Sequence, residues 1–295
     1  MKENGITLIN FINQSQNFID YIDVDNKTLK AYSAGIKSFI NFLKENGVNT
    51  PKRDDVIAYR DMLRDNYSSA TVNLYITSLK ALFNYLEVNG IYQNITKDVK
   101  GAKWETTPKK QVLSVDQVKT IYNELTNSRD RALFSLFVTT GLRGIEVERA
   151  NIEDIKVYNG EVVLFVQGKK RDSKDEYVKL SDKVLNDLKE YLEDRTYGAL
   201  FVSTSNENYG ERLSSQSMRK IVKNIFKKYG LNDSSFSLHS LRRTNAVISY
   251  ESGSSIYDIQ QVLRHSSINT TTRYLQQVNR DNNKTEFNVS DTIFG

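Results

Sequence analysis

Proline, which breaks helices, is nearly absent from this chain of 295 residues, and its scarcity limits the folds the chain can adopt. It occurs only at Pro51 and Pro108, and both lie where a helical pattern stops. Before Pro108, apolar residues recur at helical spacing in four stretches, at about 6–22, 27–46, 53–66 and 68–88. Short loops between such stretches predict a compact helical bundle.

The period of the pattern changes in the second half. Three short runs are rich in β-forming residues, at about 154–158, 162–166 and 176–180. An Asn159-Gly160 pair separates the first two runs, so we expect a small three-stranded antiparallel sheet. Helical patterns follow at about 181–195, 214–229, 237–252, 255–264 and 268–278. The expected fold is mainly α with a small antiparallel β-sheet.

Two domains and a linker are expected from this pattern. We place a helical domain at 1–94, a linker at 95–110 and a second domain at 111–295, which ends in a short apolar tail. The linker has no clear period and is rich in lysine, at Lys97, Lys100, Lys103, Lys109 and Lys110. It can be interpreted as a solvated connection or as a basic strap along phosphates.

Composition excludes several kinds of chemistry. Without cysteine the chain cannot form disulfides or use thiolates, and its two histidines would need carboxylate partners to hold zinc. We therefore expect no zinc site. The N-terminus lacks the apolar core of a signal peptide, and no window approaches a membrane span, so we expect a cytoplasmic protein. The net charge of +5 mildly favours a polyanionic partner.

Both histidines of the chain lie in one short segment, 237–275. His239 precedes Arg242 by three residues, which places both on one helix face. His265 precedes Tyr274 by nine residues. A lone histidine is more often structural than catalytic, but two histidines beside an arginine and a tyrosine indicate a site.

This combination suits the attack of a side-chain oxygen on a phosphodiester. Such a reaction needs a nucleophile, fixed cations that meet the charge on the phosphate oxygens, and a proton donor for the leaving oxygen. Arginine suits the cationic role because its planar fork matches phosphate. The candidates outside the segment are Arg143, just past a helix end at Gly141, and Lys169, in the turn of the small sheet.

These residues lie in motifs that resemble a known family. TGLRGIEV (140–147), GKK (168–170), HSLRR (239–243) and LRH followed by Tyr274 resemble the motifs of the tyrosine recombinases, or phage integrase family, and especially its Xer-like members. Their order and spacing agree, and the resemblance covers nearly the whole chain. It implies an N-terminal helical, SAM-like domain that binds core DNA, and an α+β catalytic domain that begins near Gln111.

The resemblance also implies how a scissile phosphate is held. Arg143, His239 and Arg242 would grip the phosphate, and His265 would be a further hydrogen-bond donor. Glu146 matches the acidic position of the family and would orient the basic residues.

By the same resemblance, Tyr274 would attack the phosphate and form a 3′-phosphotyrosyl link, and Lys169 would protonate the leaving 5′-oxygen. Lys170 is the alternative to Lys169, because neighbouring strand residues face opposite sides. The covalent link conserves the bond energy, so neither ATP nor a metal is implied. Tyr250 would lie three helical turns from His239, and we assign it to the core.

Two positions depart from the family pattern. Arg264 stands where glycine is usual, so we expect an altered turn before His265. Arg243 stands where histidine is frequent. Arg264 and Arg273 have two open interpretations, as phosphate contacts or as ordinary surface residues.

The function implied is site-specific recombination of double-stranded DNA, by a homo-tetramer on two DNA sites. It would serve the integration, excision or resolution of a mobile element or of chromosome dimers, in bacteria or phages and at the nucleoid. The tail FNVSDTIF (287–294) would dock into a neighbouring protomer. The alternatives are a type IB topoisomerase, which shares the tyrosine chemistry, and a DNA-binding regulator without catalysis.

Overall fold

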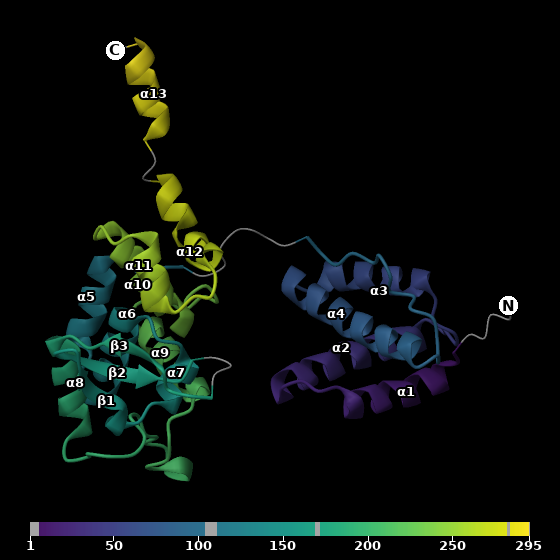
Figure 1. Ribbon diagram of the computed structural model, residues 1–295, viewed down its shortest axis with the longest axis horizontal. Helices are drawn as coiled ribbons and strands as arrows, with labels where there is room; N and C mark the ends of the chain where they lie inside the picture. Colours follow the sequence, from purple (N-terminus) through teal and green to yellow (C-terminus); the bar gives the residue numbers. More distant parts are fainter. Residues whose placement is uncertain (1–5, 104–110, 169–171, 282–283, 295) are drawn as a thin grey trace. The chain divides into compact units, whose positions relative to one another are not determined.

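The chain forms two compact units in the computed structural model, residues 1–107 and 108–295 (Figure 1). The structure describes residues 6–103, 111–168, 172–281 and 284–294, and only the backbone of 276–281. The fold is mainly helical with one small antiparallel sheet, as the sequence predicts.

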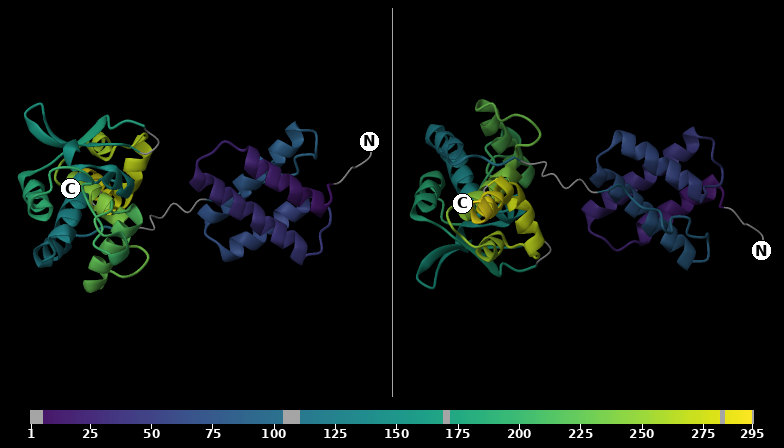
Figure 2. Two further views of the ribbon diagram at one scale, coloured as in Figure 1. Left: turned by 90° about the horizontal axis from the view of Figure 1, so that it is seen from below. Right: turned by 90° about the horizontal axis from the view of Figure 1, so that it is seen from above.

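The first unit is a helical bundle. Its helices are α1 (Leu8–Tyr21), α2 (Asn26–Glu45), α3 (Arg53–Asn66) and α4 (Ser69–Val88), which confirms the four predicted stretches. Helices α2 and α4 pack side by side, and α1 and α3 contact both (Figure 2). The core is aromatic: Phe11 stacks on Phe83 with ring centroids 5.4 Å apart, and Phe39 meets Phe11 edge-on at 6.0 Å.

The start of the expected linker packs on this bundle. Ile95 and Val99 are buried in its core. The backbone of this segment is held by three arginines of α3, whose guanidinium groups donate to carbonyl oxygens: Arg53 to Lys97, Arg60 to Lys100 and Arg64 to Gly101. The side chains of Lys97, Lys100 and Lys103 are exposed. The rest of the expected linker, from residue 104 to 110, lies outside the described residues.

The second unit opens with three helices, α5 (Val115–Glu124), α6 (Ser128–Thr140) and α7 (Gly144–Arg149), and a 3-10 turn at Ile152–Asp154. Ser114 and Gln117 have the spacing of a capping box in the sequence, and they form one at the start of α5. The sheet follows, with strands β1 (Ile155–Tyr158), β2 (Glu161–Val166) and β3 (Glu176–Lys179) in that order, all antiparallel.

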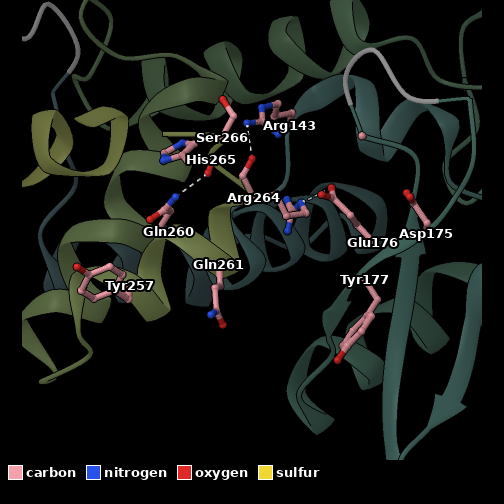
Figure 3. Close-up of a pocket in the computed structure, with 11 residues that line it drawn as sticks. Arg143, Asp175, Glu176, Tyr177, Tyr257, Gln260, Gln261, Arg264, His265 and Ser266 are labelled. Carbon is pink, nitrogen blue, oxygen red and sulfur yellow. Dashed lines mark hydrogen bonds and ion pairs between the residues drawn. The ribbon is translucent and has the colours of Figure 1, made fainter. Parts of the chain in front are cut away.

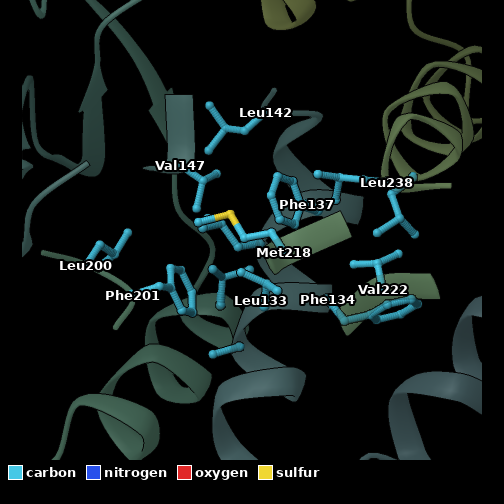
Figure 4. Close-up of a cluster of buried hydrophobic side chains, with 14 of the residues drawn as sticks. Leu133, Phe134, Phe137, Leu142, Val147, Leu200, Phe201, Met218, Val222 and Leu238 are labelled. Atoms are coloured by element: carbon cyan, nitrogen blue, oxygen red, sulfur yellow. The ribbon is translucent and has the colours of Figure 1, made fainter. Parts of the chain in front are cut away.

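Helices complete the unit. They are α8 (Asp182–Leu192), α9 (Ser215–Lys228), α10 (Leu238–Glu251), α11 (Ile256–Leu263), α12 (Ile268–Asp281) and α13 (Thr285–Phe294), with a 3-10 turn at Asn206–Asn208. Helix α6 is buried and packs against α8 and α10. Residues of α6, α7, α9 and the 200–201 segment fill the main core between them (Figure 4).

A smaller apolar cluster joins α10, α11 and α12. Val247, Ile259, Leu263 and Leu275 are buried in it, and Tyr250 packs against it, which confirms that Tyr250 belongs to the core. This cluster fixes α10, which carries His239, α12, which carries Tyr274, and α11, whose end is followed by His265. The segment 237–275 therefore packs on an apolar cluster that is separate from the main core.

The predicted apolar tail forms helix α13, whose described residues are exposed. Phe287 is 71% exposed and Phe294 is 83% exposed. Helix α13 thus contributes nothing to the core of its own unit within the described chain. None of the helices in the described ranges combines the length and apolar character that a bilayer crossing requires.

Candidate active site

Helices α10 and α12 bring His239 and Tyr274 together. Tyr274 Oη lies 2.6 Å from His239 Nε2, which is a short hydrogen bond. The two rings are nearly perpendicular, with centroids 5.6 Å apart. His239 is exposed and Tyr274 is half-buried, so the phenol oxygen faces open space beside a base. Tyr274 therefore reaches the predicted site within its own chain.

His265 lies on the other side of the Tyr274 ring. Its ring meets that of Tyr274 edge-on, with centroids 5.2 Å apart, and its Nδ1 lies 2.9 Å from Thr271 Oγ1. Burial and, after it, the charges of Arg242 and Arg143 together lower the pKa of His265 to about 3. His265 is therefore neutral near pH 7. When Thr271 donates to Nδ1, the ring proton lies on Nε2, which is then a hydrogen-bond donor.

Arg242 is buried beneath the site and ties three segments together. From α10, its Nη1 donates to the Gly141 carbonyl at 2.6 Å, and its Nη2 donates to the Leu263 carbonyl. Its Nε is buried and makes no hydrogen bond in the described chain. Burial, then the charge of Arg143, lowers the pKa of Arg242 to about 10, so it is still a cation at neutral pH.

Gly141 is required at this junction. It ends α6 in the left-handed conformation, at a φ of 60°. A Cβ there would lie 2.5 Å from Leu263 Cδ2 and 3.0 Å from Asn245 Oδ1. Only glycine lets the carbonyl that receives Arg242 approach the end of α11 so closely.

Arg143 begins α7 and shares a carboxylate with Arg264. Glu146, which is fully buried, accepts from Arg143 Nη1 and from the Arg143 backbone N–H, both at 2.7 Å. It also accepts from Arg264 Nη2 at 2.8 Å. Burial opposes ionisation of Glu146, but Arg264 and Arg143 outweigh it and lower the pKa of this carboxyl group. The predicted orienting role of Glu146 thus has a geometric basis.

Arg143 and His265 line a hollow of about 790 Å³ (Figure 3). One side is formed by residues of α11, and the other by residues at the start of β3. Arg264 lies between the two sides: its carbonyl accepts from Arg143 Nη2 at 3.2 Å, and its Nε lies 3.9 Å from Glu176 Oε2 (Figure 3). Gly168, at the end of β2, also lines the hollow. Arg143 is 29% exposed, so its guanidinium can meet an anion that enters.

The structure brings most of the predicted site residues together. Tyr274, His239, His265, Arg143 and Arg242 come from four segments distant in the sequence and form one cluster. Glu146 lies at its edge. Lys169 lies outside the described residues, as does Lys170, although the adjacent Gly168 lines the hollow.

Several contacts were not evident from the sequence. Arg243, at a position that departs from the family pattern, packs its guanidinium over the Tyr274 ring at 5.7 Å and donates to the Tyr274 carbonyl at 3.4 Å. Thr271, the partner of His265, is fully buried. No spacing rule identifies either residue, because Arg243 acts across the contact between α10 and α12, and Thr271 acts on a histidine in the turn before its own helix.

The expectation of an altered turn before His265 is wrong. Arg264 adopts the left-handed conformation that suits glycine, at a φ of 53°. Its side chain is only 5% exposed, which excludes its interpretation as an ordinary surface residue. Arg273 is exposed.

Comparisons with known proteins agree with this fold and site. Residues 111–280 match the model of the phage integrase family, and residues 11–90 match that of the phage integrase N-terminal SAM-like domain. The tyrosine recombinase XerA of Pyrococcus furiosus is 30% identical, over 88% of this chain and 87% of the relative. XerD of Listeria monocytogenes is 27% identical, over 88% and 92%.

Solved structures show the same fold. The XerH site-specific recombinase bound to palindromic difH substrate has a TM-score of 0.74 at 18% identity, over 94% of this chain and 97% of that one. A lambda integrase tetramer bound to a Holliday junction has a TM-score of 0.70 at 21% identity, over 92% and 78%.

The fold, the Tyr274–His239 pair and these matches define the class of protein, a site-specific tyrosine recombinase. The chain belongs to the phage integrase family, and it is Xer-like in the relatives that it matches.

The low pKa of His265 predicts a loss of stability in mild acid. Between about pH 6.5 and the folded pKa, the unfolded chain binds a proton that the folded chain does not, so stability falls as pH falls. From pH 6.5, where the unfolded imidazole is half protonated, to pH 5 this contributes roughly 1.5 kcal/mol, at a limiting slope of about 1.4 kcal/mol per unit. We expect His265→Gln to remove that contribution, as measured by urea unfolding at both pH values.

Arg273→Gln, an exposed change on α12, the helix that follows His265, should keep the pH dependence of the unchanged protein. Equal pH dependence in the His265→Gln variant and the unchanged protein would contradict the assignment of a neutral, buried His265.

Proposed function

We propose that this recombinase cleaves and rejoins double-stranded DNA through a 3′-phosphotyrosyl intermediate on Tyr274. The observation that carries the proposal is the 2.6 Å contact between the Tyr274 hydroxyl and His239 Nε2, beside the arginine cluster. It unites a nucleophile, a base and fixed cations within one chain. The recombinase–DNA complexes among the similar folds support DNA as the substrate.

The cleavage step begins at the phenol. A phenol has a pKa near 10 and is a weak nucleophile until it loses its proton. His239 Nε2 is placed to accept that proton as Tyr274 Oη attacks the phosphorus. The new Oη–P bond replaces the P–O5′ bond, and the 5′-oxygen leaves with a proton. In rejoining, a 5′-hydroxyl attacks the phosphotyrosine and the proton returns to Tyr274.

Cations and donors stabilise the charge that develops on the phosphate. Arg143 is open to the hollow, and Arg242 contributes its positive charge from below. Neutral His265, with its proton on Nε2, donates a hydrogen bond without changing its charge. Groups held rigidly before the reaction stabilise the transition state more than mobile ones.

Lys169 is proposed as the acid that protonates the 5′-oxygen. Lys169 directly follows Gly168 in the sequence, and Gly168 lines the hollow, where Arg149 Nη1 donates to its carbonyl at 3.4 Å. The charged form of a lysine at neutral pH has the proton that the leaving oxygen needs.

In this proposal both domains contact the DNA, and each has its own role. Residues 1–94 bind the core site, with 95–110 as the linker, and residues 111–295 carry the chemistry. The net charge of +5 and the exposed lysines at 97, 100 and 103 suit contacts to phosphates. The biological role that we propose is the integration, excision or resolution of a mobile element or of chromosome dimers.

The active assembly is proposed to be a homo-tetramer on two DNA sites, as in the lambda integrase tetramer of similar fold. Helix α13 exposes Phe287, Val289, Ile293 and Phe294. An apolar helix face without cover in its own unit is stabilised by burial against another surface. We propose that α13 docks on the neighbouring protomer.

The central test is a covalent complex. A duplex selected by the protein from a randomised pool, with a nick beside the cleavage position, should trap the protein on DNA. Tyr274→Phe should abolish the adduct and keep DNA affinity within about threefold, because only the hydroxyl is lost. Tyr250→Phe, in the core, should still form it.

The absence of an adduct in the unchanged protein would favour a DNA-binding regulator. Strand exchange between two sites separates a recombinase from a topoisomerase, which would only relax supercoils.

Arg242→Lys should lower the cleavage rate by at least about 100-fold, because an ammonium cannot replace the planar fork. DNA affinity should stay within about tenfold, since binding is spread over many phosphates. The matched control is Arg195→Lys: Arg195 also donates to two backbone carbonyls, at Ala199 and Leu200, and should leave cleavage unchanged. Single-turnover cleavage and gel-shift titrations measure the two effects. A hundredfold loss of affinity would refute the expectation that Arg242 contributes mainly to cleavage and little to DNA binding.

Deletion after Lys284 removes α13. Binding to a single site should be unchanged, while cooperative assembly on a two-site DNA should weaken by at least about tenfold, because one apolar contact per protomer is lost. Gel-shift titrations with one-site and two-site duplexes measure both. Unchanged cooperativity would exclude the exchange of α13 between protomers.

A further inference from the structure

Arg264 combines two features that are rarely found together. It ends α11 in the left-handed conformation, which strains a residue that has a Cβ. The other described non-glycine residues with positive φ are Asp98, Asn159 and Glu193, and all three are exposed. Arg264 is the one whose side chain is buried, at 5% exposure. The strain is therefore accompanied by specific contacts of the guanidinium group.

Those contacts connect Arg264 to Arg143 in a closed ring. Arg264 Nη2 donates to Glu146 Oε2, and Glu146 Oε1 accepts from Arg143 Nη1. Arg143 Nη2 in turn donates to the Arg264 carbonyl at 3.2 Å. One residue thus holds Arg143 twice, once by its own carbonyl and once through Glu146.

The left-handed turn is what makes both contacts possible. It directs the Arg264 carbonyl toward Arg143 while the side chain returns past its own helix end, where Nη1 donates to the Val262 carbonyl at 2.6 Å. The Arg264 guanidinium lies between Glu146 and the start of β3. Its Nε is 3.9 Å from Glu176 Oε2 (Figure 3). Nε itself is buried and has no hydrogen bond in the described chain.

The electrostatic consequence concerns the charge that Arg143 presents. If Glu146 faced Arg143 alone, the pair would be nearly neutral and Arg143 would be drawn toward the carboxylate. With Arg264 on the second oxygen, two guanidinium groups share the Glu146 carboxylate, and Arg264 also faces Glu176 on its other side. Glu146 therefore offsets less of the Arg143 charge toward the hollow, and Arg143 is held in a fixed orientation.

We propose that Arg264 is a positioning residue for phosphoryl transfer: it sets the orientation and effective charge of Arg143 through Glu146. The proposal rests on the proposed function, because the anion that Arg143 meets is the scissile phosphate. Arg264 is not required to touch DNA.

Arg264→Gly is the decisive variant, because glycine keeps the carbonyl and suits the left-handed turn, but removes the guanidinium. We expect the single-turnover rate of adduct formation on the selected, nicked duplex to fall about 10- to 100-fold, as small misplacements of catalytic groups do. DNA affinity should stay within about threefold. Arg264→Lys keeps the charge and should recover at least about tenfold of the lost rate.

Glu193→Gly is the matched control. Glu193 also has a positive φ, 50°, at the end of α8 and is exposed, so glycine relieves a positive-φ backbone strain there without touching the site. It should form the adduct at the rate of the unchanged protein. Introducing Arg264→Gly into a Glu146→Gln variant tests whether Arg264 acts through Glu146. If it does, Arg264→Gly should lower the rate of adduct formation by less than about threefold in that variant.

The outcomes separate this inference from the proposed function. No adduct in the unchanged protein would overturn the proposed function itself. An adduct formed equally fast by the unchanged protein and by Arg264→Gly would overturn only the role of Arg264. A full rate loss that persists in the Glu146→Gln background would overturn the route through Glu146.

Discussion

The site depends on one buried cation, Arg242. A guanidinium at 1% exposure is costly to bury, so it must be hydrogen-bonded. The chain meets this cost with the backbone carbonyls at two helix ends, Gly141 after α6 and Leu263 in α11. Helix C-termini have negative partial charge and free carbonyls, which suits a cation. The same bonds fix the positions of Arg143 and His265. Arg143 follows Gly141 closely in the chain, and His265 follows Leu263 in the same way.

Around Arg242 the site is built from shared partners. Glu146 serves Arg143 and Arg264, and the Tyr274 ring lies between His239, His265 and Arg243. A side chain held by two neighbours has less freedom than one held by a single neighbour, and so loses less entropy when the substrate binds. The neutral state of His265 follows first from its burial and then from the nearby cations Arg242 and Arg143.

Much of the fold could be predicted from the sequence because it is local. Helical spacing identified α1 to α4, and the Ser114–Gln117 pair identified the start of α5, since a capping box involves only neighbours in the chain. The three strands could be predicted because the apolar pattern changes there from helical spacing to short β-rich runs. Tyr250 could be assigned to the core because its distance from His239 along one helix is fixed by helix geometry.

What the sequence determined by itself was the set of reactive groups and the family they belong to: a tyrosine, two histidines and two arginines in a recognisable order. Only the tertiary structure decided how they act together. The Tyr274–His239 contact, the burial of Arg242, the neutral His265 and the ring through Arg264 join residues that are distant in the chain. Hydrogen bonds and pKa values depend on distance and burial in space, and sequence spacing does not specify either.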